Sequence, residues 1–434
     1  MAIVTRDRGS RRIDCAHGAA DKEPICHCPV RKSGIRVCGP VIFLRILLCQ
    51  CQAYGTIRRT VRSFMLTRFE VEYFKAFCGH LVFDFKARDY AFNPSLVKNG
   101  IVKNALVYGP NGIGKSCLGL ALFDLISHLT DKKQINPVYL VGYQNFSVPP
   151  DRPVRFKYCF DFDGNKIVYE YAKSAARELL WEKFKVNGGL VVDWDYFNPA
   201  VRSLAFPGAA RLTVDLPDNK LSVIKYLRRN LPTGTVPMLD KMVAFADGML
   251  WYRSLSEGNA YAGFQSGGRA FLGDQICKAG KLDDFSQFLR RNGLDYKLDS
   301  RPVDGEDTII IVDPKTKRTL PFDSVASTGT KALELFYYWS LVSFTELSFL
   351  FIDEFDAFIH FKSAAEIVRQ LNKSVFQSVL TTHNTYLMQN DFTRPDCCFL
   401  MSPCSIKNLP ACTDREIREA HNLEKMYQSG VFNA

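Results

Sequence analysis

The clearest chemical pattern in the sequence is "GPNGIGKS" at residues 109–116, which fits G-x-x-x-x-G-K-[ST]. The apolar run "ALVY" precedes it and "CLGLALFDLI" follows, so we expect a strand, a glycine-rich turn and a helix. Glycines let backbone N–H groups approach phosphate oxygens, and the helix N-terminus adds a positive dipole. An ordinary glycine turn is the alternative, which the flanking strand and helix disfavour. The pattern predicts a nucleoside triphosphate site.

Each residue of this loop has an expected role. Lys115 should reach the β- and γ-phosphates, and Ser116 should ligate magnesium. The residues expected to line the phosphates are Gly109, Pro110, Asn111, Gly112, Ile113, Gly114, Lys115, Ser116 and Cys117.

An acidic pair follows the apolar strand in "LSFLFIDEFDAFIH" at 347–360. Asp353 stands at the carboxyl end of that strand, which is where ligands bind in parallel sheets. Asp353 can hold magnesium through water, and Glu354 can polarise the attacking water. By themselves the two acids fit a solvated strand end equally well. The phosphate loop elsewhere in the chain favours the functional interpretation.

Two further segments place polar groups at strand and helix ends. His383 in "TTHN" ends the next strand and could bond the γ-phosphate, although a lone histidine there is more often structural. Ser327 and Gly329 in "SVASTGTKALELF" precede a helix and could form a second anion cradle. An ordinary N-cap is the simpler explanation of that serine in isolation. Since one nucleotide needs one such cradle from its own subunit, this one plausibly serves a nucleotide on another subunit.

The hydrophobic pattern predicts an α/β protein with a mixed sheet flanked by helices, an antiparallel β subdomain and a largely helical insertion. Phe156, Tyr158, Phe160 and Phe162 alternate before a hairpin turn at 163–164, and strands alternate with helices after residue 308. We divide the chain into 1–64, a poorly ordered or non-native leader; 65–171, an N-terminal lobe; 172–307, the insertion, for sensing or docking; and 308–434, a C-terminal lobe.

Charge and cysteines are concentrated at the N-terminus. Residues 1–64 contain 12 Lys or Arg and 4 Asp or Glu, so the remaining 370 residues carry only +3 of the net +11. A global basic surface for nucleic acid is therefore not indicated. Six of the 14 cysteines lie there without paired C-x2-C spacing, so a zinc site is disfavoured. Translation starting at Met65 is a hypothesis that fits this leader.

No apolar stretch is long enough to span a bilayer, and the scattered remaining cysteines fit a reducing compartment. We therefore expect a cytoplasmic protein with no membrane partner.

Taken in order, the motifs resemble those of ABC-class P-loop ATPases of the SMC/RecF/OLD-like branch, over roughly 65–434. "FEVEYFKAF" at 69–77 is similar to that branch's opening strand, "GPNGIGKS" to Walker A and "FLFIDE" to Walker B. "STGTKAL" resembles the ABC signature and "TTHN" the switch histidine. The resemblance puts Asp356 in the D-loop place and makes Gln144, in "GYQNFS", a Q-loop glutamine and magnesium ligand. The closing segment is similar to stand-alone bacterial ATPases often labelled AAA-family.

The resemblance implies a magnesium-dependent ATPase that sandwiches two ATP molecules between two heads. Long SMC coiled coils are missing from the 211 positions between Ser116 and Ser327, and 51 residues after His383 are too few for an OLD nuclease domain. The first hypothesis is therefore an ATP-hydrolysing switch that controls a separately encoded effector in an antiphage-defence or toxin-type module. The alternative is a RecF-like DNA-repair accessory that binds DNA through Arg228, Arg229, Arg290 and Arg291, although solvated helix ends are the simpler interpretation of these arginines.

Overall fold

The computed structural model describes residues 64–132, 139–216, 218–255, 259, 261–264, 272–303 and 305–433. All of them belong to one compact unit that comprises residues 52–434. The predicted leader, with its cysteines, lies outside the described residues up to position 63. Its last residue, Phe64, begins the first strand, and a translation start at Met65 stays a prediction. Within the described part of the chain, no helix combines the length and apolarity that crossing a bilayer requires.

A mixed central sheet confirms the predicted α/β class. Within the described residues it has seven strands in the order β12-β11-β16-β17-β5-β18-β19, of which the five inner ones run parallel and the two edge strands antiparallel. The strands are β5 (Asn104–Tyr108), β11 (Met249–Arg253), β12 (Tyr261–Gly263), β16 (Phe349–Asp353), β17 (Gln377–Thr382), β18 (Cys398–Ser402) and β19 (Ser405–Asn408).

The second large sheet is antiparallel throughout and forms the predicted β subdomain. Among the described residues its order is β10-β9-β8-β7-β6-β1-β2. Its strands are β1 (Phe64–Glu72), β2 (His80–Asp84), β6 (Val154–Phe162), β7 (Asn165–Ala175), β8 (Glu178–Val186), β9 (Gly189–Asp195) and β10 (Ser203–Leu204). The alternating aromatic residues of β6 are buried on one face, and the turn at 163–164 joins β6 to β7 as predicted.

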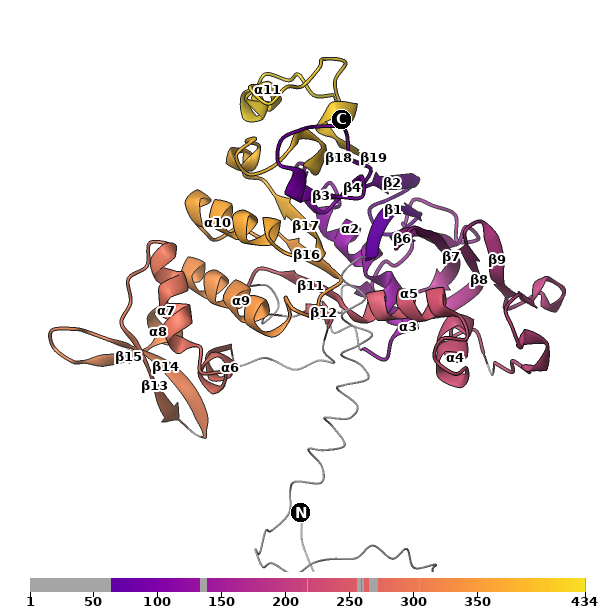
Figure 1. Ribbon diagram of the computed structural model, residues 1–434, viewed down its shortest axis with the longest axis horizontal. Helices are drawn as coiled ribbons and strands as arrows, with labels where there is room; N and C mark the ends of the chain where they lie inside the picture. Colours follow the sequence, from indigo (N-terminus) through magenta and orange to yellow (C-terminus); the bar gives the residue numbers. More distant parts are fainter. Residues whose placement is uncertain are drawn as a thin grey trace, which may run out of the picture. The chain divides into compact units, whose positions relative to one another are not determined.

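Helices lie on both faces of the central sheet (Figure 1), and a separate hydrophobic cluster packs against each face. On β16, Phe349 and Phe351 pack with α2, α3, α5 and the antiparallel sheet, whereas Leu350 and Ile352 pack with α9 and α10. The helices are α2 (Lys115–Leu122), α3 (Asp124–Leu129), α4 (Val223–Asn230), α5 (Pro237–Asp247), α6 (Leu272–Lys278), α7 (Leu282–Arg291), α8 (Phe322–Val325), α9 (Thr328–Val342), α10 (Phe361–Asn372) and α11 (Leu423–Gln428).

The range 172–307 contains strands as well as the expected helices α4 to α7. The boundary proposed after residue 171 falls inside β7, because the antiparallel sheet continues through β8, β9 and β10. Period-2 alternation in "ELLWEKFKV" and "GLVVDWD" accounts for two of these strands. The range also supplies β11 and β12 to the central sheet. Small sheets are formed by β13 (Leu298–Val303), β14 (Glu306–Val312) and β15 (Thr319–Pro321), and by β3 (Val97–Lys98) and β4 (Ile101–Val102).

Candidate nucleotide-binding site

The phosphate loop connects the buried strand β5 to helix α2, as the sequence predicts. Gly112 and Gly114 have φ values of 77° and 105°, in the left-handed region that disfavours side chains. At Gly109 a Cβ atom would lie 3.0 Å from the carbonyl oxygen of Met401. The backbone of the loop is therefore set by conformation and by close packing. Pro110, Asn111 and Gly112 are exposed, while Ile113, Ser116 and Cys117 are half-buried.

Lys115 lies at the centre of the loop and is 6% exposed. Its Nζ donates to the carbonyl oxygens of Gly109 and Pro110 at 2.8 and 3.0 Å and lies 2.9 Å from His383 Nε2. Burial lowers the pKa of Lys115, an effect that the carboxylates of Asp353 and Glu354 oppose. Lysine and switch histidine, 268 positions apart in the chain, thus meet at one edge of the sheet.

Ser116 and Asp353 also come together, although they belong to different lobes. Ser116 Oγ donates to Asp353 Oδ2 at 2.6 Å, and Thr381 Oγ1 donates to Asp353 Oδ1 at 2.7 Å. Asp353 is fully buried, and burial raises its pKa while these two bonds and the charge of Arg253 oppose the rise. A hydroxyl and a carboxylate beside a phosphate loop are oxygen ligands of the kind that Mg²⁺ prefers. The residues present therefore fit the predicted metal.

Glu354 follows Asp353 in an unusual backbone conformation, with a φ of 48°. Its N–H donates to Thr381 Oγ1 at 2.7 Å, and its Oε2 accepts from Arg253 Nη2 at 2.6 Å. Thr381 and Arg253 are site residues that the sequence reasoning missed. Thr381 stands inside the quoted motif "TTHN", and Arg253 ends an apolar strand, "MLWYR", just as Asp353 does.

Asp356 is held next to the end of β17. Its Oδ2 accepts from Thr382 Oγ1 at 2.7 Å, and Thr382 Oγ1 also accepts from the N–H of Asn384 at 2.9 Å. Burial raises the pKa of Asp356, and side-chain hydrogen bonds with Thr382 and Asn384 oppose the rise. The D-loop and switch segments of the sequence are thus in contact.

Ser327 and Gly329 lie at the start of α9, where Ser327 Oγ accepts from the N–H of Thr330 at 3.2 Å. Ser327 is exposed, and a Cβ atom on Gly329 would lie 2.6 Å from the carbonyl oxygen of Phe358. Within the described part of the chain, no hydrogen bond joins Ser327 to the phosphate loop. The signature turn therefore packs on the D-loop segment of its own chain.

Gln144 is engaged elsewhere. Its Nε2 donates to the carbonyl oxygens of Pro149 and Arg152 at 2.9 and 2.6 Å, and its backbone bridges to Phe74. None of its hydrogen bonds in the described part of the chain reaches Ser116 or Asp353. Its role as a magnesium ligand stays a prediction.

Comparison with known proteins gives one family match. Residues 255–389 match the family described as "AAA domain, putative AbiEii toxin, Type IV TA system". This range includes the signature turn, Walker B, D-loop and switch histidine, and it excludes the phosphate loop at 109–116. No curated protein matches the chain.

Several solved structures are similar at low identity. The SMC head domain from Thermotoga maritima is 16% identical, with 79% of this chain and 98% of that chain covered and a TM-score of 0.36. An Smc head bound to the C-winged helix domain of ScpA is 15% identical, with 80% and 98% covered and a TM-score of 0.38. RecF with ATP is 12% identical, with 80% and 99% covered and a TM-score of 0.35. The AAA-domain match over residues 255–389 agrees with the P-loop ATPase motifs of the sequence.

Proposed function

We propose that the protein binds ATP with Mg²⁺, hydrolyses it, and uses the cycle as a switch. The observation that carries this proposal is the convergence of Lys115, Ser116, Asp353, Glu354 and His383 at one edge of the central sheet. These residues come from two lobes that are far apart in sequence, and they are brought to the loop that precedes α2. The pattern supplies the parts that phosphoryl transfer requires.

Each residue has a physical role in the proposed reaction. The N–H groups of the loop and the Lys115 ammonium bind the phosphates, and the dipole of α2 adds to their field. Ser116 and Asp353 would hold Mg²⁺, which neutralises charge on the phosphates when bound. Glu354 orients and polarises the attacking water, and His383 bonds the γ-phosphate. Catalysis then comes mainly from positioning and electrostatics.

A second copy of the chain would complete the site. Ser327 is exposed at the N-terminus of the 15-residue helix α9 and makes no hydrogen bond to its own phosphate loop among the described residues. A helix N-terminus of this kind attracts anions. This arrangement supports a sandwich in which the signature turn of one head contacts the nucleotide of the other. Asp356, beside the turn, would then lie at the head interface.

The biological role is proposed as control of a separately encoded effector in an antiphage-defence or toxin-type module in the bacterial cytoplasm. The family description, which names a type IV toxin–antitoxin system, supports this class of module. ATP binding would close two heads and hydrolysis would open them, so that binding energy is coupled to a change of shape.

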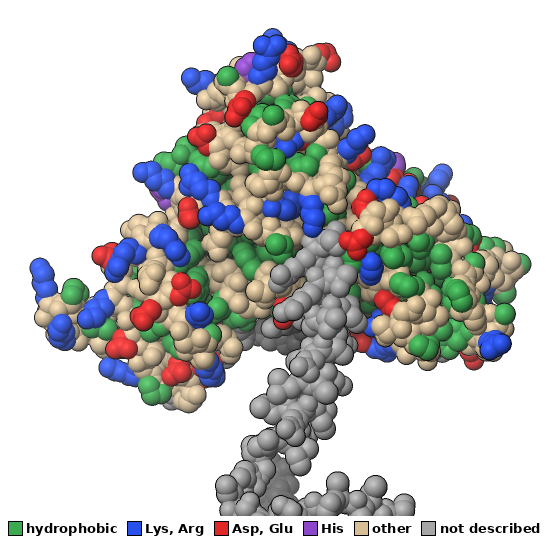
Figure 2. All heavy atoms as spheres, viewed as in Figure 1, with side chains coloured by type: hydrophobic (Ala, Val, Ile, Leu, Met, Phe, Trp, Pro, Cys, Tyr) green, Lys and Arg blue, Asp and Glu red, His purple; other side chains and the backbone are tan. Residues whose placement is uncertain are grey.

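The DNA-repair alternative receives less support from the arginines on which it depends. Arg228 pairs with Asp240 at 3.2 Å, Arg229 pairs with Asp131, and Arg290 pairs with Asp295 at 2.9 Å. The cavity of about 300 Å³ beside α4 is lined by Asp131, Asp240 and Asp247 as well as by basic residues. On the face shown in Figure 2, acidic side chains lie among the basic ones. Such mixed charge does not favour binding of a nucleic-acid phosphate backbone.

The test measures phosphate release from Mg-ATP by the full chain, together with its molar mass with and without ATP. We expect wild-type turnover, loss of ATP binding in Lys115→Ala, and a 10²- to 10⁴-fold loss of turnover in Glu354→Gln, which should retain ATP and dimerise. Absence of turnover in the wild type would refute hydrolysis. An unchanged mass of both wild type and Glu354→Gln on adding ATP would refute the sandwich.

A further inference from the structure

Strand β11 brings an arginine to the acidic pair. β11 and β16 pair in parallel, with Arg253 in register with Asp353, so their carboxyl ends meet at the same edge of the sheet. Arg253 Nη2 donates to Glu354 Oε2 at 2.6 Å, and Arg253 Nε lies 3.9 Å from Asp353 Oδ2. The N–H of Ser254 donates to the carbonyl oxygen of Asp353 at 3.3 Å, which continues the pairing past the arginine. The guanidinium thus faces both acids.

Glu354 is the site residue that most needs external support. Its φ of 48° is a strained conformation for a residue with a side chain, and its backbone N–H is fixed by Thr381. Its side chain is 31% exposed and has three rotatable bonds, so the backbone alone does not fix the carboxylate. Among the described residues, the side-chain carboxylate of Glu354 accepts a hydrogen bond from Arg253 alone. Orientation of the carboxylate therefore depends on that arginine.

A contribution to folding stability does not explain the ion pair between Arg253 and Glu354. The Arg253 side chain is 39% exposed and that of Glu354 31%, and ion pairs of such exposure contribute little to stability. The other four residues of β11 are buried, so the strand is anchored without its last residue. Arg253 also faces Asp353, with its Nε 3.9 Å from Asp353 Oδ2. Its location and charge serve the two carboxylates.

We propose that Arg253 is a positioning residue that holds the Glu354 carboxylate in the orientation required to polarise the attacking water. This inference rests on the proposed ATPase function. Arg253 acts through Glu354, whereas Lys115 and the loop bind the phosphates. Removal of the guanidinium should therefore lower kcat and leave the KM for ATP nearly unchanged. Lysine at the same position keeps the charge without the planar fork, so it should restore part of the rate.

The experiment measures kcat and KM for Mg-ATP in the full chain with Arg253→Ala, Arg253→Lys, Glu354→Gln and the double variant. We expect a 10- to 100-fold loss of kcat in Arg253→Ala, a smaller loss in Arg253→Lys, and little further loss when Arg253→Ala is added to Glu354→Gln. The control is Arg418→Ala, since Arg418 forms a pair with Glu416 at 2.8 Å on the surface, and it should match the wild type.

The outcomes separate the two proposals. Wild-type turnover with an unaffected Arg253→Ala variant overturns the positioning role and leaves the ATPase in place. The positioning role is also overturned if Arg253→Ala costs as much in the Glu354→Gln background as in the wild type, because the arginine would then act independently of the glutamate. Absence of wild-type turnover overturns both proposals. Urea denaturation should give nearly the same midpoint for wild type and Arg253→Ala, which would show that a loss of rate is not a loss of folding.

Discussion

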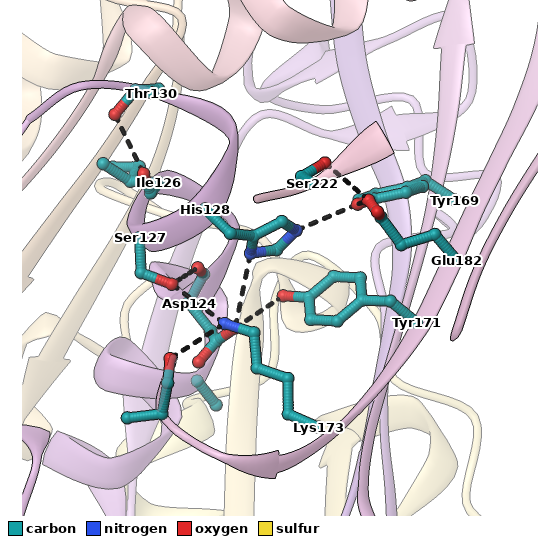
Figure 3. Close-up of polar contacts among 12 residues, drawn as sticks. Asp124, Ile126, Ser127, His128, Thr130, Tyr169, Tyr171, Lys173, Glu182 and Ser222 are labelled. Atoms are coloured by element: carbon teal, nitrogen blue, oxygen red, sulfur yellow. Dashed lines mark hydrogen bonds and ion pairs between the residues drawn. The ribbon is translucent and has the colours of Figure 1, made fainter. Parts of the chain in front are cut away.

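Two clusters of charged residues in this protein differ in almost every physical respect. The candidate nucleotide site lies at the carboxyl ends of the parallel strands. There Lys115 contacts His383, and Glu354 contacts Arg253, although the members of each pair are far apart in the chain. The second cluster lies between α3 and the antiparallel sheet, and Figure 3 shows its side chains pointing toward one another from these elements. Asp124 and Lys173 at its centre are both fully inaccessible to solvent.

The second cluster is a closed network. Asp124 accepts hydrogen bonds from Lys173 Nζ at 2.6 Å, from the hydroxyl of Tyr171 at 2.9 Å and from that of Tyr143 at 2.6 Å. His128 Nε2 lies 2.9 Å from the hydroxyl of Tyr169. That tyrosine also donates to a second buried acid, Glu182, which in turn accepts from Tyr196, Ser222 and the N–H of Val223.

The contrast shows why ionisable residues alone do not mark a site. Burial lowers the pKa of Lys173 and His128 and raises that of Glu182, so a search for shifted pKa values would select this network. Yet its charged groups bond to one another or to neighbouring hydroxyls, and Asp124, Lys173 and Glu182 are all inaccessible to solvent. At the nucleotide site Asp353 is also buried, but it stands at the end of strand β16, and Glu354 in the turn that follows is partly exposed. Accessibility and strand-end location distinguish the two clusters.

The largest effect on stability is expected from Lys173→Met. The change leaves the Asp124 carboxylate buried without its cation, which should lower the free energy of unfolding by about 3–5 kcal/mol in urea denaturation. Lys183→Met is the matched control, since Lys183 is 37% exposed and pairs with Asp193 at 3.5 Å, and it should cost less than about 1 kcal/mol. The comparison breaks if the two variants lose the same amount, or if Lys173→Met abolishes ATP binding while remaining fully folded.

Glu334 sharpens the comparison, because it is buried like Asp124 but its Oε1 has no hydrogen-bond partner among the described residues. Burial raises the pKa of Glu334 to about 8. The folded state then binds more protons than the unfolded state between pH 4.5 and 8, so stability should fall as pH rises through that window. We expect a loss on the order of 2–3 kcal/mol.

Glu334→Gln should remove that pH dependence. Thermal unfolding measured at pH 5 and pH 8 would then show a smaller difference in the variant, which should be the more stable protein at pH 8. Equal differences in variant and wild type would show that the side chain is not titrating as its burial implies.

An intermediate effect is expected at Thr381, which links the two acids of the nucleotide site. Thr381→Val keeps the shape but removes the hydroxyl that donates to Asp353 and accepts from Glu354. We expect kcat for ATP to fall about 10- to 100-fold, as it does when outer-shell partners are lost elsewhere. Thr413→Val, at a turn where the hydroxyl accepts from the N–H of Arg415, provides the control and should keep full activity. Normal kcat in Thr381→Val would mean that the hydroxyl does not orient the acids.

The smallest effect is expected at Arg290. Its pair with Asp295 is exposed on both sides, at 65% and 76%, so Arg290→Ala should change the free energy of unfolding by less than about 0.5 kcal/mol. Binding of duplex DNA, measured at two salt concentrations, should be equally weak in variant and wild type. A salt-dependent affinity that falls on removing Arg290 would revive the repair alternative.

Much of the site follows from short stretches of sequence. The segments that resemble Walker A, Walker B, the switch histidine and the signature are local patterns, and each lies on or directly beside the element that its hydrophobic periodicity predicts. Local patterns do not predict which residues bond to Asp353 and Glu354. Arg253 and Glu354 are 101 positions apart, and only the strand register brings them together. The motif setting of Gln144 predicts a magnesium ligand, whereas its side-chain amide donates to carbonyl oxygens of its own loop.

The buried network left no signal in the sequence. In the sequence, Asp124 is a single polar residue in an apolar helical segment. Lys173 and Glu182 lie in segments of alternating hydrophobicity, where a polar residue is ordinary. Their pairing depends on which face of β7 and β8 packs on α3, and single-sequence periodicity does not fix that choice. In the range 172–307 the hydrophobic pattern of the sequence indicates mainly helices, whereas the structure has strands there as well.

The close packing of Gly329 against Phe358 has a consequence for how two heads would communicate. The turn that would touch the other head's nucleotide is in contact with the segment that follows this head's own acids, with no space for even a methyl group between them. If two ATP molecules are bound across a shared interface, a movement of the Ser327 turn caused by one of them would displace the segment beside the acids that act on the other. Such a pair should turn over as a cooperative unit, with a Hill coefficient for ATP above one.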